Sequence, residues 1–165
     1  MSVTISGSGQ IVKQIIQATL LTKFTTTSTV PTFANTGLSV SITPTNSANK
    51  ILVMIDSRGA SSSSSGVLFS LLRNGSTVTA YQGTQNAGSQ SITAGQIYQS
   101  DPNSVSQISI IYLDSPATTS AVTYSLGIAS YNGSTVQINR SQSDTNAGYT
   151  PVPASSITVM EVAYA

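Results

Sequence analysis

The alternating side chains of residues 107–129 constrain the fold of this chain more than any other stretch. In the first half, Ile108 and Ile110 point to one side of an extended backbone while Ile111 and Leu113 point to the other, so both sides are apolar. In the second half one side is apolar, with Val122, Tyr124, Leu126 and Ile128. This period of two is typical of β-strands. We therefore expect two strands, the first buried on both faces and the second on one, in a core between two sheets.

The connection between these two strands has the composition of a turn. Asp114, Ser115 and Pro116 follow one another directly. An aspartate can cap a turn through its side chain, and proline fixes φ and donates no hydrogen bond to a sheet. The two strands are therefore expected to form a hairpin in which Asp114 caps the turn.

Further strand-like stretches precede and follow this one, separated by turn residues. They cover residues 36–42, 50–58, 66–73, 76–81, 91–99, 134–139 and 156–165. The dipeptides Asn74-Gly75 and Asn132-Gly133 are typical of tight hairpins. The almost continuous apolar run at 50–58 is expected in the centre of a sheet, and the five serines at 61–65 in a flexible loop. Together these signals predict an all-β fold, an antiparallel β-sandwich of about ten strands with jelly-roll-like wiring.

Residues 11–21 fit two patterns. Their apolar side chains can form the stripe of a helix or one face of a strand. The β-branched residues and the threonines that follow favour a strand, with a helix as the alternative. We expect one β-sandwich domain over residues 11–165, preceded by a small, polar N-terminal arm at residues 1–10.

The low charge of the chain favours association. Among 165 residues there are 6 basic and 5 acidic side chains, whereas 52 residues are serine or threonine. Hydrophobic residues make up 39 % of the chain, which is enough for a folded core. With a net charge of +1, copies of the protein repel one another only weakly. This composition is typical of a subunit in an assembly.

The composition also lacks the residues that most enzymes and metal sites use. There is no His and no Cys, which removes the commonest general base and the commonest metal ligands. A glycosidase would need two carboxylates across a cleft, and no such pair is recognisable. Asp101, like Asp114, stands in a turn sequence, and a calcium ion at such loops is the alternative to turn capping. We expect no catalysis, no cofactor and no metal.

Nucleic-acid and membrane binding are not expected either. The basic residues are scattered singly along the chain and form no cluster; they are Lys13, Lys23, Lys50, Arg58, Arg73 and Arg140. No apolar run approaches the roughly 18 residues of a membrane span. The first ten residues lack the charged start and apolar centre of a signal peptide.

Three segments of the chain resemble a known family. They are TGLSVSITPTNSANKILVMI (36–55), YLDSPATTSAVTYSL (112–126) and SSITVMEVAYA (155–165). These sequences are similar to a β-sandwich domain of virion structural proteins from tailed phages of aquatic bacteria, including capsid decoration and tail-fibre-type proteins. The resemblance spans about residues 14–165, and its motifs mark a fold rather than a chemistry. It implies a trimeric β-domain on the exterior of a phage particle.

The function expected from this resemblance is capsid decoration. The chain would be a cement or head-ornament protein, a homotrimer that binds the major capsid protein or another virion protein and stabilises the shell. The alternative is a tail-fibre or receptor-binding domain that recognises a host surface glycan or protein. The domain starts ten residues after Met1, whereas fibre proteins carry long upstream segments, and this favours the first function.

The two ends of the chain are candidates for assembly contacts. The N-terminal arm is expected to lie against another subunit or the shell, and the last strand ends close to the C-terminus. The candidate contact residues are Ser2, Val3, Thr4, Ile5 and Tyr164.

Tyrosines near turns are candidates for surface recognition. Tyr81, Tyr131 and Tyr149 stand close to predicted turns, where an aromatic ring can stack on a sugar or contact a neighbouring subunit. The alternative is that they are simply exposed.

Glu161 is a candidate for a buried ion pair. It stands in the middle of the last strand, on a face that also carries Ile157 and Val159. A buried carboxylate requires a partner or a raised pKa. Arg140 is the preferred partner, followed by Arg58 or Arg73. A solvated glutamate on an exposed face is the alternative.

Overall fold

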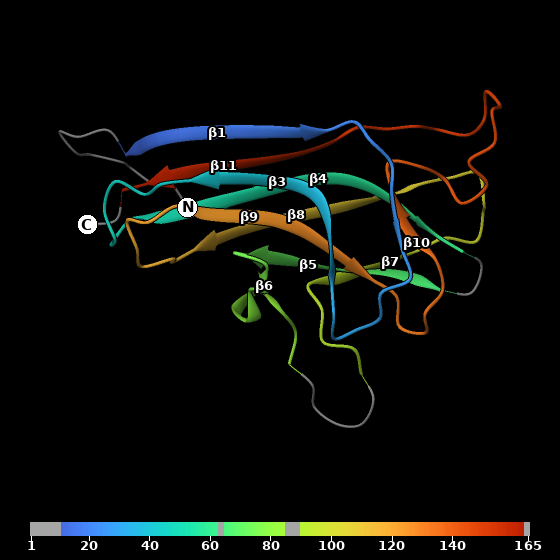
Figure 1. Ribbon diagram of the computed structural model, residues 1–165, viewed down its shortest axis with the longest axis horizontal. Helices are drawn as coiled ribbons and strands as arrows, with labels where there is room; N and C mark the ends of the chain where they lie inside the picture. The colour runs from blue at the N-terminus through green and yellow to red at the C-terminus, as the bar shows by residue number, and fades with distance from the viewer. Residues whose placement is uncertain (1–10, 63–64, 85–89, 164–165) are drawn as a thin grey trace, which may run out of the picture.

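The protein is an all-β sandwich of two antiparallel sheets, as the alternation of its side chains predicts. The computed structural model describes residues 11–62, 65–84 and 90–163 (Figure 1). The six-stranded sheet contains β1 (Val12–Leu20), β2 (Phe24–Thr26), β4 (Lys50–Ser61), β8 (Ser106–Asp114), β10 (Val136–Ile138) and β11 (Ser155–Val162). The five-stranded sheet contains β3 (Ala34–Ile42), β5 (Gly66–Arg73), β6 (Ser76–Thr77), β7 (Gly95–Tyr98) and β9 (Val122–Ala129). A 3-10 turn, η1, covers Thr79–Tyr81.

Strand β4 is the centre of the six-stranded sheet, as its apolar run predicts. Its residues 51–59 pair with β8 on one side. On the other side, residues 50–56 pair with β11 and residues 59–61 with β10. Strand β1 pairs with β11, so β1 and β8 lie on opposite sides of the β11–β4 pair. The long strands run along the longest axis of the molecule (Figure 1).

One hydrophobic core fills the space between the two sheets. From the six-stranded sheet it takes alternate residues, among them Ile51, Val53 and Ile55 of β4. Its largest fully buried side chains from the other sheet include Tyr124 and Leu126 of β9. Removing such side chains from water is the main source of folding free energy, about 1.5–3 kcal/mol for each large apolar residue.

Strands β8 and β9 do not form the expected hairpin. Strand β8 pairs with β4, whereas β9 pairs with β3 and β5 in the other sheet. The burial of the two strands is also the reverse of the prediction. Strand β9 is buried on both faces, while β8 buries Ile108 and Ile110 and exposes Ile111 and Leu113. The period of two identifies both strands, but it carries no information about which face of a strand is covered by other parts of the fold.

The two predicted tight turns have different outcomes. Asn74 and Gly75 both have positive φ and connect β5 to β6, as predicted. Asn132-Gly133 is not a hairpin turn, because it leads from β9 in one sheet to β10 in the other. Residues 11–21 form strand β1, so the helix alternative is wrong. The predicted serine loop is partly strand, since β4 continues to Ser61.

Candidate functional site

The outward face of β1, β11, β4 and β8 carries a continuous group of apolar side chains. Ile15 of β1 lies opposite Met160 of β11, which lies opposite Leu52 of β4, which lies opposite Leu113 of β8. In the neighbouring row, Met54 lies opposite Ile111. These six residues form the apolar face: Ile15, Leu52, Met54, Ile111, Leu113 and Met160.

The apolar face is open to solvent. Ile15 is 57 % exposed, Ile111 66 % and Leu113 50 %, and the other three residues are half-buried. Four adjacent strands extend over about 15 Å, at roughly 4.8 Å between neighbours. Large contiguous apolar patches are rarely exposed on the surface of a folded domain, and where they occur they usually mark an interaction site. This face is therefore the best candidate for a functional surface among the described residues.

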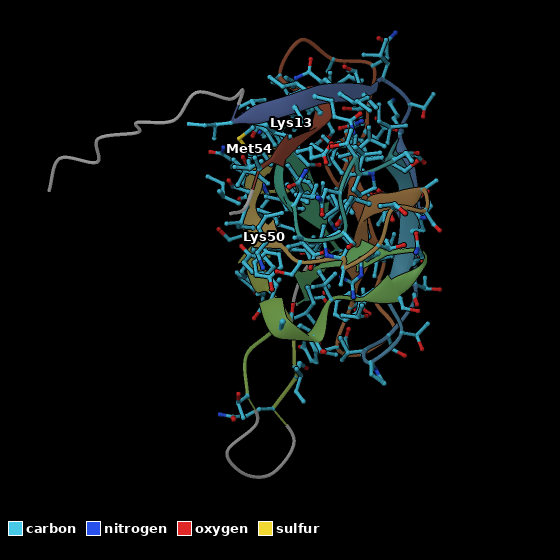
Figure 2. The ribbon with its side chains drawn as sticks, turned by 90° about the vertical axis from the view of Figure 1, so that its left-hand side faces the viewer. Lys13, Lys50 and Met54 are labelled. Carbon is cyan, nitrogen blue, oxygen red and sulfur yellow. The ribbon has the colours of Figure 1, made fainter. Side chains whose placement is uncertain are left out.

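Polar and charged residues border the apolar face at both ends of the strands. At one end, Asp56 accepts hydrogen bonds from Arg58 and, at 2.9 Å, from Gln107. At the other end lie Lys13 and Lys50, on the same side of the molecule as Met54 (Figure 2). An apolar centre with a polar border is the usual composition of a protein–protein interface.

Glu161 is fully buried, but its partners are neutral. Its Oε1 atom accepts hydrogen bonds from the backbone N–H of Thr45 at 2.7 Å, the Thr45 hydroxyl at 2.8 Å and the Asn49 amide at 2.7 Å. Its Oε2 atom accepts one from the Gln14 amide at 2.7 Å. Burial alone raises the pKa of Glu161, but these hydrogen bonds outweigh it and lower the pKa to about 2. The carboxylate thus joins β11, β1 and the β3–β4 loop.

The predicted ion pair between Glu161 and Arg140 is wrong. Arg140 pairs instead with Asp144, at 3.2 Å, and a hydrogen bond from Lys23 to Asp144 lowers the pKa of that aspartate. The physical reason is position along the strand. Asn139 contacts Ser155, at the start of β11, and Glu161 lies six residues further along, about 20 Å away. The other two candidates, Arg58 and Arg73, pair with Asp56 and Asp114.

Asp114 is a buried ion-pair residue rather than a turn cap. Its carboxylate accepts hydrogen bonds from Arg73 of β5 at 3.1 and 2.8 Å and from the Tyr124 hydroxyl of β9 at 2.6 Å. Burial, together with the hydrogen bond to Asp114, raises the pKa of Tyr124. Asp114 thus connects the end of β8 to the other sheet. By contrast, Asp101 caps its turn as predicted, since it accepts a hydrogen bond from the Asn103 N–H at 3.0 Å.

The structure separates the three candidate recognition tyrosines. Tyr81 is half-buried and its ring packs against Tyr112, with 4.8 Å between ring centroids, so it is not a freely presented side chain. Tyr149 is exposed in the 141–154 segment. Tyr131 is also exposed and lines a cavity to which neither of the others contributes.

The other site predictions are mostly outside the described residues. The candidate assembly residues Ser2, Val3, Thr4, Ile5 and Tyr164 all lie there. Within the described ranges, no three His, Cys, Asp or Glu side chains come together in a way that could hold a metal ion. The same residues form no helix long and apolar enough to cross a membrane.

The fold and its exposed face define a class rather than a family: an all-β sandwich that presents a four-strand apolar surface. In comparisons with known proteins, no protein-family model matches the chain, and no curated protein matches it significantly.

Proposed function

We propose that this chain is a non-catalytic structural protein of a phage virion, a decoration protein that binds the outer capsid shell and stabilises it. The observation that carries the proposal is the apolar face, which one copy of the chain leaves open to solvent on a regular sheet. The low net charge and the resemblance of residues 36–55, 112–126 and 155–165 to virion domains support it.

The apolar face is proposed to be the contact between copies in a homotrimer. It extends from β1 at one side to β8 at the other, so the β8 side of one copy can meet the β1 side of the next around a threefold axis. A contact between different parts of the surface closes into such a ring when each copy is rotated by a third of a turn from the next. Each large apolar side chain that becomes fully buried contributes about 1.5–3 kcal/mol.

The N-terminal arm is proposed to attach this trimer to the shell. Three identical arms on one trimer bind together, so a weak contact for each arm becomes strong attachment for the assembly. The shell would then be stabilised against internal pressure by many such trimers on its outer surface.

The location of the protein on the particle tests this function directly. Quantitative mass spectrometry and electron cryo-microscopy of purified phage particles that contain the chain should show it on the capsid exterior, in a ratio to the major capsid protein set by the shell symmetry. A copy number on the scale of tail fibres, with density only on the tail, would show that the function is not capsid decoration.

The trimer prediction can be tested with two matched variants on β8. Purified protein should scatter light as a particle of about 50 kDa, three times the 17.0 kDa chain. Ile111→Asp should give a folded monomer, because it places a charge in the apolar face. Ser109→Asp is the control, since Ser109 is exposed on the same face of the same strand but lies opposite Asp56, outside the apolar face.

Two results would contradict the proposed interface. One is a wild-type monomer at micromolar concentration. The other is a trimer that Ile111→Asp leaves intact, which would place the contact on another surface.

Deletion of residues 2–9 tests the role of the arm. The shortened protein should keep the melting temperature of the full chain and should lose most of its binding to particles stripped of decoration protein. Co-sedimentation with such particles measures this binding, with full-length protein as the reference. If the shortened protein binds as well as the full chain, the attachment surface lies within residues 11–165.

A further inference from the structure

A cavity on the five-stranded sheet has the chemistry of a sugar-binding site. Its volume is about 350 Å³, and its lining residues include Leu68, Gln90, Ile92, Thr93, Gln96 and Tyr131. In the register of the sheet, Leu68 of β5 lies between Gln96 of β7 and Ala129 of β9. Because Val67 and Phe69 belong to the core, Leu68 points outward and forms the floor of the cavity. Tyr131, two residues after Ala129, stands at its side.

The lining is neutral and combines stacking with hydrogen-bonding groups. Among the lining residues that the structure describes, none carries a formal charge, and the amides of Gln90 and Gln96 offer both donors and acceptors. The ring of Tyr131 is 52 % exposed. An anion or a cation would find no counter-charge here, and a purely apolar ligand would remove the amides from water without replacing their hydrogen bonds.

Two features hold this lining in place before any ligand binds. The Thr93 hydroxyl lies 2.6 Å from the Phe69 carbonyl oxygen and accepts a hydrogen bond from the Gly95 N–H, which ties the segment before β7 to β5. The Gln96 side chain lies across Gly66, where a Cβ atom would come within 2.1 Å of its amide nitrogen. A glycine at position 66 therefore lets the Gln96 amide lie flat against the sheet.

We propose that this cavity binds a short segment of a neutral glycan, with a sugar ring stacked on Tyr131 and its hydroxyls hydrogen-bonded to Gln90 and Gln96. The cavity volume lies within the usual range of about 300–1,000 Å³ for small-ligand sites. The cavity lies on the five-stranded sheet and the apolar face on the six-stranded one, so a copy can bind its neighbours and a glycan at the same time. The glycan site does not depend on the proposed decoration function.

Saturation-transfer NMR with the full chain tests the proposal. The probes are four neutral disaccharides (maltose, cellobiose, mannobiose and N,N′-diacetylchitobiose) and one acidic one, digalacturonic acid. At least one neutral disaccharide should receive saturation from the wild-type protein. Tyr131→Ala should weaken its binding about tenfold, which corresponds to about 1.4 kcal/mol. Gln96→Ala should have a similar effect and provides a second variant if Tyr131→Ala does not fold.

Tyr149→Ala is the matched control, because Tyr149 is an exposed tyrosine that does not line the cavity. It should bind the disaccharide as the wild type does. The proposal is overturned if no neutral disaccharide receives saturation, if only the acidic one does, or if folded Tyr131→Ala and Gln96→Ala both bind normally. Equal losses in Tyr131→Ala and Tyr149→Ala would also overturn it, since binding would then not be localised in the cavity.

Discussion

Glu161→Ala is expected to lower the free energy of unfolding by about 3–5 kcal/mol, a large part of the stability of a domain of this size. The variant removes an acceptor that satisfies the Asn49 and Gln14 amides and both donors of Thr45. Hydrogen bonds to a charged group contribute about 1.5–3 kcal/mol each, and their sum is reduced here because Thr45 is exposed and Gln14 half-buried, so that water can replace the carboxylate at their donors. Urea unfolding followed by circular dichroism measures the loss.

Glu161→Gln is the matched control for this variant. It keeps the size of the side chain and one acceptor oxygen, but its new amide group faces a donor on Gln14. We expect a loss of about 1–2 kcal/mol, clearly smaller than that of the alanine variant. If Glu161→Ala unfolds at the same urea concentration as the wild type, the four hydrogen bonds do not stabilise the fold.

The same carboxylate predicts a dependence of stability on pH. The folded pKa of Glu161 is about 2, against an ordinary value of 4.5. A lowered folded pKa adds stability above the unfolded pKa, and this stability is lost as the pH falls from about 4.5 to about 2. At about 1.4 kcal/mol for each pKa unit, the contribution is of the order of 3 kcal/mol. The wild type should therefore lose its advantage of about 1–2 kcal/mol over Glu161→Gln within this range and become the less stable of the two at its acid end, whereas the other carboxylates affect both proteins alike.

Asp114→Ala is expected to lower the free energy of unfolding by about 2–4 kcal/mol. The variant leaves the buried Tyr124 hydroxyl without its acceptor and removes the partner of Arg73. The loss is below that of a completely buried ion pair, because the Arg73 side chain is 38 % exposed and can turn its guanidinium to water. Urea unfolding measures this loss as well.

A double-mutant cycle with Tyr124→Phe separates the hydrogen bond from other effects of Asp114→Ala. Tyr124→Phe removes only the hydroxyl, so the two variants should be non-additive by about 1 kcal/mol or more. Asp101→Ala provides the comparison with an aspartate in an exposed turn, where the expected loss is below about 1 kcal/mol. Strict additivity would mean that Asp114 and Tyr124 stabilise the protein independently. Because Asp114 directly follows Leu113, its loss should also loosen the β8 side of the apolar face.

The candidate functional surface could be predicted only in part. The sequence shows Ile111 and Leu113 as the second apolar side of a strand, and this was interpreted as burial on both faces. An apolar side that another sheet covers and one that a partner covers look alike in a sequence. Tyr131 was recognised as a candidate, but the cavity beside it was not, because its walls come from β5, β7 and the segments on either side of residues 85–89.

For Glu161 and Asp114, too, the sequence predicts only part of what the structure shows. The position of Glu161 between apolar neighbours indicates burial on one of two possible faces, and that burial is found. Its partners were missed because Thr45, Asn49 and Gln14 are neutral and lie 112 to 147 residues away along the chain. The neighbours Ser115 and Pro116 predict that Asp114 caps a turn, and both residues do lie in the connection between β8 and β9. The Asp114 carboxylate, however, accepts hydrogen bonds from Arg73 of β5 and Tyr124 of β9.

Local sequence patterns are enough to predict that this chain is all-β, where most of its strands lie and which side chains share a face, because the period of two and the turn residues are local properties. Three features are visible only in the folded chain: β8 and β9 belong to different sheets, one side of β8 stays open, and neutral donors surround Glu161. The physical reason is that pairing between strands and the covering of a face depend on segments far apart in the chain, whose meeting no local pattern specifies.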